Sequence, residues 1–255
     1  MLVQHERHGD VAIVRLNDPA TLNALNPDMA AALREALTHA AGQSRALLLC
    51  GAGRGFCSGW NLTSHTGDGP VEAGANVETH INPLLLTLRD LPIPWVSAVQ
   101  GAAAGVGASL ALAADLIVAG DSAYFLQAFR RIGLIPDGGA TWLLNRAVGR
   151  VRAMELMLLG ERLPAYRALE WGLINRMVAD DSVESAGLDL AKDLAAGPTR
   201  VLGLIRRAAW SGTAGDLEAA LKTERDLQAE AATTEDFQEG VRAFLEKRPA
   251  VFTGR

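Results

Sequence analysis

A stretch of small residues at positions 101–115, GAAAGVGASLALAAD, places three glycines within seven positions ahead of an apolar run. This pattern predicts a tight loop that enters a buried helix, with bare backbone N–H groups able to bind an anion or a polarised oxygen. The third glycine of a dinucleotide-binding fingerprint would fall at Leu110, and the Gly-Lys-Ser/Thr of a P-loop is absent. Two interpretations remain for Gly105, Val106 and Gly107. Either the Val106 N–H holds a developing oxyanion, or the small residues pack a helix closely.

A second glycine loop at positions 54–60, RGFCSGW, follows a short apolar run and offers another backbone donor at Trp60. Its G-x-C-x-G pattern also resembles a nucleophile elbow, which needs an acid and then a histidine further along the chain. All five histidines lie at or before residue 80, which disfavours a cysteine hydrolase and predicts that Cys57 is a small buried residue. Two such loops could hold one carbonyl oxygen between paired N–H groups.

Asp137 is the acid with the most suggestive surroundings, in GLIPDGGATWLL ahead of a predicted helix. Its side chain could cap that helix, which would lower its basicity. Alternatively, apolar neighbours such as Leu134 and Ile135 could desolvate the carboxylate and raise its basicity. The sequence leaves these two roles open. Asp115, at the start of a predicted strand, and Asp121, in a turn, are assigned structural roles.

Composition excludes several other classes of function. The chain has 255 residues, 49% of them hydrophobic, and a net charge of −5. This size fits one domain with a helical appendage, and the lack of a basic face argues against nucleic-acid binding. Two cysteines and charged first residues predict a cytoplasmic protein, and no H-E-x-x-H or C-x-x-C metal motif is present. The apolar run at 102–114 predicts a core helix rather than a membrane span.

Strands and helices alternate in the first part of the chain, and helices alone follow. Strands are predicted at residues 11–16, 46–50, 94–99 and 115–120, and helices at 27–41, 77–89, 139–148 and 151–159. Four more helices are predicted at 182–196, 199–211, 216–231 and 235–247. This order predicts an α/β fold with a C-terminal helical region that packs on a partner subunit. The polar, glycine-rich residues 64–74 are predicted to form a mobile loop.

Five segments together resemble the crotonase superfamily, the enoyl-CoA hydratase/isomerase family: LNALN, GAGRGFCSGWNL, VQGAAAGVGASLALAADLIVAG, IGLIPDGGATWLLNRAVG and EGVRAFLEKRPAVFTG. They occur in the family's order, and the resemblance spans about residues 8–254. It implies a crotonase-like spiral of ββα units at residues 1–195 that carries an acyl-CoA site. It also implies a C-terminal helical region at 196–255 that covers the CoA and builds homotrimers, often paired into hexamers. No cofactor is expected beyond the coenzyme A of the substrate.

In proteins of this family two backbone N–H groups hold the thioester oxygen, and the matching positions here are Trp60 and Val106. Hydratases of the family also carry two glutamates, at positions where this chain has Ser109 and Phe129. Adding water across a double bond needs one group to activate the water and another to manage the α-carbon proton. The missing pair therefore disfavours hydration. Moving a double bond needs a single base, for which Asp137 is the remaining candidate.

An aspartate in IPD without the glutamate pair is similar to the isomerases of phenylacetate degradation. Those enzymes convert a ring-epoxide CoA thioester to an oxepin and also shift 3-enoyl to 2-enoyl double bonds. The resemblance therefore implies an acyl-CoA isomerase, with enoyl-CoA hydration and non-catalytic acyl-CoA binding as alternatives. Where this chain has Trp60-Asn61, the more usual pair has an acidic second residue. The resemblance therefore specifies the type of reaction more narrowly than the substrate.

The resemblance also implies substrate contacts. Ala24 and Leu25 would lie near the adenine and Ser58 near the pantetheine arm. Phe244 and Lys247 would come from the C-terminal helix of this or a neighbouring subunit, their alternatives being helix packing and a solvated charge. The remaining expected binding residues are Gly59, Gly105, Gly107, Ser109 and Phe129, the last two as parts of the pocket wall. No metal ligand is expected.

Overall fold

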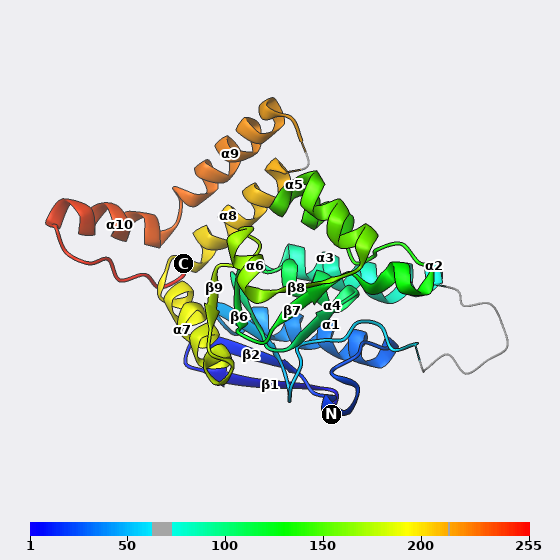
Figure 1. The fold of residues 1–255 in the computed structure, drawn as a ribbon. Helices are drawn as coiled ribbons and strands as arrows, with labels where there is room; N and C mark the ends of the chain where they lie inside the picture. Colours follow the sequence, from blue (N-terminus) through cyan, green and yellow to red (C-terminus); the bar gives the residue numbers. More distant parts are fainter. Residues whose placement is uncertain (63–72, 214) are drawn as a thin grey trace.

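The computed structural model describes residues 1–62, 73–213 and 215–255, and in them the chain forms two β-sheets surrounded by helices (Figure 1). The main sheet has six strands in the order β1-β2-β3-β4-β6-β9. β1 pairs antiparallel with β2, whereas all other neighbours in this sheet are parallel. The strands are β1 Val3–His8, β2 Val11–Leu16, β3 Ala46–Gly51, β4 Trp95–Val99, β6 Leu116–Gly120 and β9 Arg176–Val178.

A smaller sheet of three strands alternates with the main one along the chain. It contains β5 Ala102–Ala104, β7 Tyr124–Leu126 and β8 Arg162–Pro164. The chain runs from β4 to β5 and then into helix α4, Val106–Leu112. It runs again from β6 to β7, through a short 3-10 helix, into α5, Ala140–Leu159. This repetition is the spiral of ββα units that the sequence predicts, and the prediction of the fold is confirmed.

The other helices cover the main sheet or extend beyond it. They are α1 Pro27–Ala41, α2 Ala73–Asn76, a π-helical turn Val77–Ile81, α3 Asn82–Asp90, α6 Ala165–Glu170, α7 Val183–Ala196, α8 Thr199–Gly212, α9 Leu217–Ala231 and α10 Glu235–Glu246. Short 3-10 helices lie at Pro19–Thr21, Ala128–Ile132 and Asp180–Ser182.

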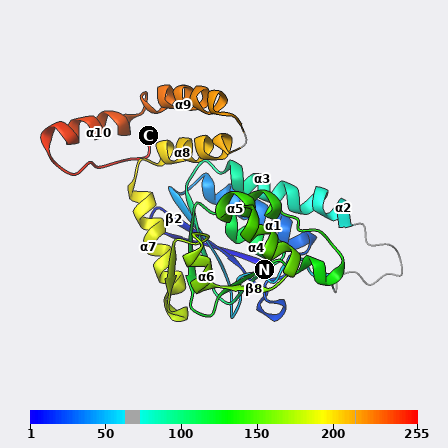
Figure 2. The ribbon, with the colours of Figure 1, turned by 45° about the horizontal axis from the view of Figure 1, so that its top comes forward.

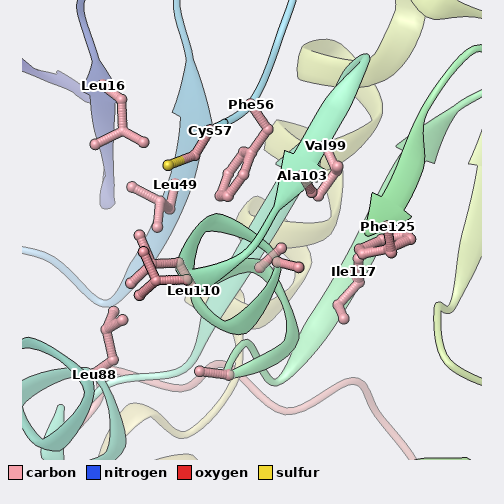
Figure 3. Close-up of a cluster of buried hydrophobic side chains, with 14 of the residues drawn as sticks. Leu16, Leu49, Phe56, Cys57, Leu88, Val99, Ala103, Leu110, Ile117 and Phe125 are labelled. Atoms are coloured by element: carbon pink, nitrogen blue, oxygen red, sulfur yellow. The ribbon is translucent and has the colours of Figure 1, made fainter. Parts of the chain in front are cut away.

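Alternation along the buried strands divides the core into two layers. On β3, Leu47 and Leu49 belong to the cluster shared with α1, α3 and α4, whereas Leu48 and Cys50 belong to the cluster under α7. A strand buried on both faces reads as a continuous apolar run, which is why ALLLC is recognisable in the sequence. Figure 3 shows part of the larger cluster, in which Leu110 of α4 lies among side chains from the strands and α3.

Local signals explain several element boundaries. Asn26 caps α1 by accepting a hydrogen bond from the backbone N–H of Met29 at 2.8 Å, and Pro27 occupies the first helical position. Gly149, at φ 76° and ψ 160°, breaks α5 at the place where two separate helices are predicted. Between residues 77 and 89 the chain forms a π-helical turn followed by α3 rather than one α-helix.

The prediction of one helix over residues 102–114 is wrong at its beginning. Ala102–Ala104 instead pairs with Tyr124–Leu126 as β5, and Gly105 at φ 54° separates this strand from α4. Strand β1 and the short strands β7, β8 and β9 are not predicted from the sequence. β1 is a charged edge strand with one buried residue, Val3. The loop expected at 64–74 lies mostly outside the described residues.

Helices α9 and α10 extend away from the two sheets in both views (Figures 1 and 2). α7 ends at Ala196, one residue beyond the predicted division of the chain at 195/196, and that division stays a prediction. α8 is joined to the core by the buried Arg206, whose guanidinium contacts Asp115 at 2.6 Å. In the described part of the chain no helix is both long and apolar enough to cross a membrane.

Candidate active site

A cleft lies where the two glycine loops meet the segment before α5. Most of its lining is apolar, and Asp137 is the one titratable side chain among the described residues that line it. The lining residues are Ser58, Gly59, Trp60, Leu62, Ala73, Asn76, Val77, Ile81, Gly105, Val106, Ala128, Phe129, Ile132, Leu134 and Asp137.

The two glycine loops are in direct contact at the bottom of this cleft. A Cβ added to Gly59 would lie 2.9 Å from the carbonyl oxygen of Ala104 and 3.8 Å from the Cα of Gly105. Both glycines have positive φ, 104° for Gly59 and 54° for Gly105, a region that L side chains rarely adopt. The residues that follow them, Trp60 and Val106, are therefore brought together from segments 46 positions apart in the sequence.

The N–H groups of Trp60 and Val106 are available for a ligand. Val106 begins α4, and the first N–H groups of a helix have no intrahelical acceptor. Neither N–H donates a hydrogen bond to protein within the described residues. Both residues line the same largely apolar cleft, and paired backbone donors in such a site can stabilise a carbonyl oxygen as it gains negative charge.

The first loop is held in place by two residues that precede α1. Asn23 is completely buried, and its Nδ2 donates to the carbonyl oxygen of Gly55 at 2.8 Å. Leu25 donates to Gly59 and accepts from Asn61, both at 2.7 Å, in a bridge that fixes Trp60 between them. The backbone of Leu25 therefore positions the donor loop, while its side chain is fully buried.

Asp137 does not cap α5. That helix begins after Gly139, which has no side-chain cap, and the buried Oδ1 of Asp137 has no hydrogen-bond partner among the described residues. Burial raises the pKa of Asp137 to about 6. A half-buried carboxyl group whose Oδ1 has no partner among the described residues, in a cleft also lined by Trp60 and Val106, is suited to accept a proton near neutral pH.

The other expected pocket residues take different places. Phe129 lines the cleft, with ring atoms 3.7 Å from where a Cβ on Gly105 would lie. Ser109, expected in the wall, is instead completely buried, and its Oγ donates to the carbonyl oxygen of Asp137 at 3.0 Å. Gly107 packs on the first loop, because a Cβ there would lie 2.3 Å from the carbonyl oxygen of Cys57.

The remaining expected contacts, apart from Ser58, lie outside the described lining of the cleft. Ser58 lines it, although its hydroxyl donates to the carbonyl oxygen of Thr21 at 2.8 Å. Ala24 is buried beside Leu25. Phe244 is 82% exposed on α10, and Lys247 ends that helix, on an element that Figure 1 shows apart from the glycine loops.

Sequence reasoning missed the part of the cleft that the π-helical turn contributes. The Trp60 ring stacks on His80, with centroids 6.0 Å apart and planes 24° from parallel. His80 belongs to the π-helical turn Val77–Ile81, which also supplies Val77 and Ile81 to the cleft. Such turns are frequent at functional sites, but no sequence signal distinguishes them from an ordinary helix.

Cys57 is completely buried, and this burial raises the pKa of its thiol to about 12. A thiol in this state is not a nucleophile, which agrees with its predicted structural role. Among the described residues, no group of three or more His, Cys, Asp or Glu side chains is placed to hold a metal ion.

Comparison with known proteins now adds to this geometry. Residues 6–255 match the model of the family described as enoyl-CoA hydratase/isomerase. The chain belongs to the enoyl-CoA hydratase/isomerase family. A relative from Escherichia coli K12 named 1,2-epoxyphenylacetyl-CoA isomerase is 46% identical, over 100% of this chain and 98% of its own length. This likeness supports the resemblance to the phenylacetate branch of the crotonase superfamily.

Other members of the enoyl-CoA hydratase/isomerase family carry different names. A "Probable enoyl-CoA hydratase" of Rhodobacter capsulatus is 45% identical, over 99% of this chain and 98% of its own. A solved structure of an enoyl-CoA hydratase from Polaromonas sp. JS666 superposes with a TM-score of 0.92 at 32% identity, covering 98% of this chain and 99% of the other. Membership in the family therefore supports an acyl-CoA thioester as substrate, while the names divide between isomerase and hydratase.

Proposed function

We propose that this chain is an acyl-CoA isomerase that moves a double bond with Asp137 as its acid/base. It acts on a 3-enoyl-CoA to give the 2-enoyl-CoA, or on a ring-epoxide CoA thioester to give an oxepin. The observation that carries the proposal is the state of Asp137, an unpaired carboxylate in an apolar cleft with no other titratable lining residue described.

The reaction needs only groups already in the cleft. The Asp137 carboxylate takes a proton from C2 of the 3-enoyl thioester, and the electron pair delocalises onto the thioester oxygen. The Trp60 and Val106 N–H groups donate to that oxygen in the resulting dienolate, and removing one such donor typically costs about 10²–10³ in rate. The protonated Asp137 then returns a proton to C4, which leaves the double bond between C2 and C3 and regenerates the carboxylate.

Water addition needs a second group that activates the water, and the described lining of the cleft holds none. Asn76 and Ser58 are the neutral polar side chains there, and the Ser58 hydroxyl is occupied as a donor to Thr21. Neither side chain is a general base at neutral pH. The apolar Phe129, which lines the same cleft, favours a substrate with an apolar chain or ring near the reacting carbons.

The test uses purified protein with a 3-enoyl-CoA in D₂O, followed by mass spectrometry and NMR. We expect the 2-enoyl product to appear, with deuterium at C4 in the fraction of turnovers in which the proton on Asp137 exchanges with solvent before it is returned. Asp137→Asn keeps the side chain's shape but cannot accept the proton, so the product should fall by at least about 10²-fold. Asp121→Asn, at an exposed turn, is the matched control and should retain activity.

Three results would contradict the proposal. Full activity of Asp137→Asn would remove the aspartate from the mechanism. Formation of the 3-hydroxyacyl product from a 2-enoyl-CoA, faster than the bond shift, would make the chain a hydratase. Binding of CoA thioesters without bond shift or proton exchange would leave only a binding protein. Ring-epoxide thioesters follow as the second substrate class, suggested by the name of the Escherichia coli relative.

The remaining CoA contacts are proposed to need an assembly. Phe244 and Lys247 lie on α10 and at its C-terminal end, apart from the cleft. The exposed side chains of Phe237, Val241, Phe244 and Leu245 give α10 an apolar surface. We expect a homotrimer or a dimer of trimers in which a neighbouring α10 covers the CoA. Light scattering of the purified 26.9 kDa chain checks this, since a monomer would contradict it.

A further inference from the structure

We propose that Ser109 is a positioning residue that sets the place of Asp137 relative to the oxyanion donor Val106. This inference rests on the proposed function, because it concerns the same base and the same donor. In this proposal, one face of α4 positions both the base, Asp137, and the oxyanion donor, the Val106 N–H.

The contact itself is short and buried. Ser109 is completely inaccessible, and its Oγ donates to the carbonyl oxygen of Asp137 at 3.0 Å across 28 positions of sequence. The next residue, Gly138, lies directly on the same helix. A Cβ there would be 3.0 Å from the Cβ of Ser109 and 3.0 Å from Cγ2 of Val106. The backbone at 137–138 is therefore seated on the Val106–Ser109 face of α4.

The anchoring uses the backbone of Asp137 and leaves its side chain free. The Asp137 carbonyl oxygen accepts from Ser109 Oγ and also from the Ala140 N–H, at 3.1 Å. Its buried Oδ1 has no partner within the described residues. A carboxylate that must exchange a proton with substrate cannot be held by its own oxygens, so its position has to come from the main chain.

Val106 and Ser109 are three residues apart on α4, which puts them on one face of the helix, about one turn from each other. Val106 presents the N–H that receives the oxyanion, and Ser109 holds the residue that receives the proton. A displacement of about 1 Å between such groups can cost about 10²-fold in rate. Losing the Ser109 hydroxyl would release one of the two hydrogen bonds on the Asp137 carbonyl and loosen this spacing.

Ser97 offers a closely matched control. It is also completely buried, and its Oγ donates to the carbonyl oxygen of Ala111 on the same helix, also at 3.0 Å. Ser97→Ala thus removes the same kind of bond to α4 without touching the cleft. Both alanine variants should lower the melting temperature by similar amounts, since each loses one buried hydroxyl–carbonyl bond.

The kinetic result separates the two variants. For Ser109→Ala we expect kcat of the 3-enoyl-CoA shift to fall about tenfold or more, with KM within about twofold. For Ser97→Ala we expect kcat near that of the wild type. Ser109→Cys keeps a weaker donor of similar size and should recover part of the lost kcat.

A titration measures the same effect without turnover. In wild-type protein, burial holds the pKa of Asp137 at about 6. A loosened 137–138 segment admits water, so the carboxyl of Ser109→Ala followed by ¹³C NMR should titrate at lower pH than in wild type or Ser97→Ala. The acid limb of the kcat–pH profile should move in the same direction.

The outcomes are distinguishable from failure of the proposed function. If Asp137→Asn is inactive while Ser109→Ala matches Ser97→Ala in kcat and in the Asp137 titration, the positioning role is overturned and the isomerase proposal stands. If Asp137→Asn remains fully active, both proposals fall. Loss of kcat and a lowered Asp137 titration in Ser109→Ala alone support the positioning role.

Discussion

Asp137 owes its basicity to the exclusion of water rather than to a charged neighbour. Burial is the cause of its raised pKa, and no ion pair or hydrogen bond to its side chain is found in the described residues. A carboxylate in this condition destabilises the folded protein whenever it is charged, because its solvation in the unfolded chain is better. The residue that makes the site chemically useful is therefore expected to reduce stability.

Measuring the free energy of unfolding as a function of pH tests whether the charged Asp137 carboxylate destabilises the folded protein. The pKa of Asp137 is about 6 in the folded protein and near 3.8 in the unfolded chain, so the folded state binds more protons between those values. Stability then falls as pH rises from about 4 to 6, and the loss is complete above 6. Asp137→Asn should be more stable than wild type at pH 8 by on the order of 1 kcal/mol, because partial solvent exposure reduces the full value.

Urea unfolding of the two proteins at pH 4 and pH 8 measures this difference. The advantage of Asp137→Asn should shrink toward zero at pH 4, where the wild-type carboxyl is protonated in the folded state. An advantage of the same size at both pH values would assign it to the amide itself. A wild type that is the more stable protein at pH 8 would mean that the carboxylate is held by a partner.

At the scale of elements, the oxyanion site depends on the close approach of one helix to one loop. α4 carries small residues on its first turn, and Gly107 lies against the backbone of Cys57. Of the two interpretations left open for Gly105, Val106 and Gly107, close helix packing is seen at Gly107, and the oxyanion role of Val106 stays a proposal. Close packing by Gly107 is what brings the Val106 N–H beside the Trp60 loop.

Gly107→Ala tests this packing. The added Cβ would lie 2.3 Å from the Cys57 carbonyl oxygen and 2.8 Å from its Sγ, so loop and helix must separate. We expect a loss of about 1–3 kcal/mol in the free energy of unfolding, together with a lower kcat. Gly212→Ala at the end of α8, where nothing lies within 4 Å, should change stability by less than about 1 kcal/mol and in the favourable direction. Equal effects of the two variants in urea unfolding would contradict the packing argument.

Across the whole molecule, a buried ion pair joins the C-terminal helices to the sheet that carries the site. The Arg206 side chain on α8 is 4% exposed, and it contacts Asp115, which precedes β6, as well as the carbonyl oxygens of Leu88 and Leu91. Asp115 also accepts from the Trp95 N–H at the start of β4. Asp115 thus has the structural role predicted for it, because it links α8, β4 and β6.

Arg206→Ala should be strongly destabilising, because it leaves the half-buried Asp115 carboxylate, whose side chain is 22% exposed, without its cation. Breaking such a pair typically costs about 3–5 kcal/mol. The exposed pair between Arg200, also on α8, and Glu230 of α9, at 3.3 Å, supplies the control. Arg200→Ala should cost no more than about 1 kcal/mol. Chemical denaturation of both variants measures this, and a small loss for Arg206→Ala would contradict the anchoring role.

The amino-acid sequence by itself determined the elements whose signals are local. An asparagine and a proline start α1, apolar runs mark β3 and β4, and glycines mark both donor loops and the break in α5. Its motifs also identified the family that the comparisons show. Three-residue strands such as β5 and β7 escaped prediction, because their pairing comes from residues about 20 positions away rather than from their own pattern.

Only the tertiary structure decided that the Asp137 side chain does not cap α5. The segment IPDGG is compatible with a helix cap and with a base, and the choice depends on which atoms surround the carboxylate. Ser109, 28 positions earlier, takes the backbone carbonyl, and the positive φ of Gly138 and Gly139 starts the helix without the aspartate side chain. A pKa follows from solvation and contacts in three dimensions, and these are set by chain segments that local sequence patterns do not relate to one another.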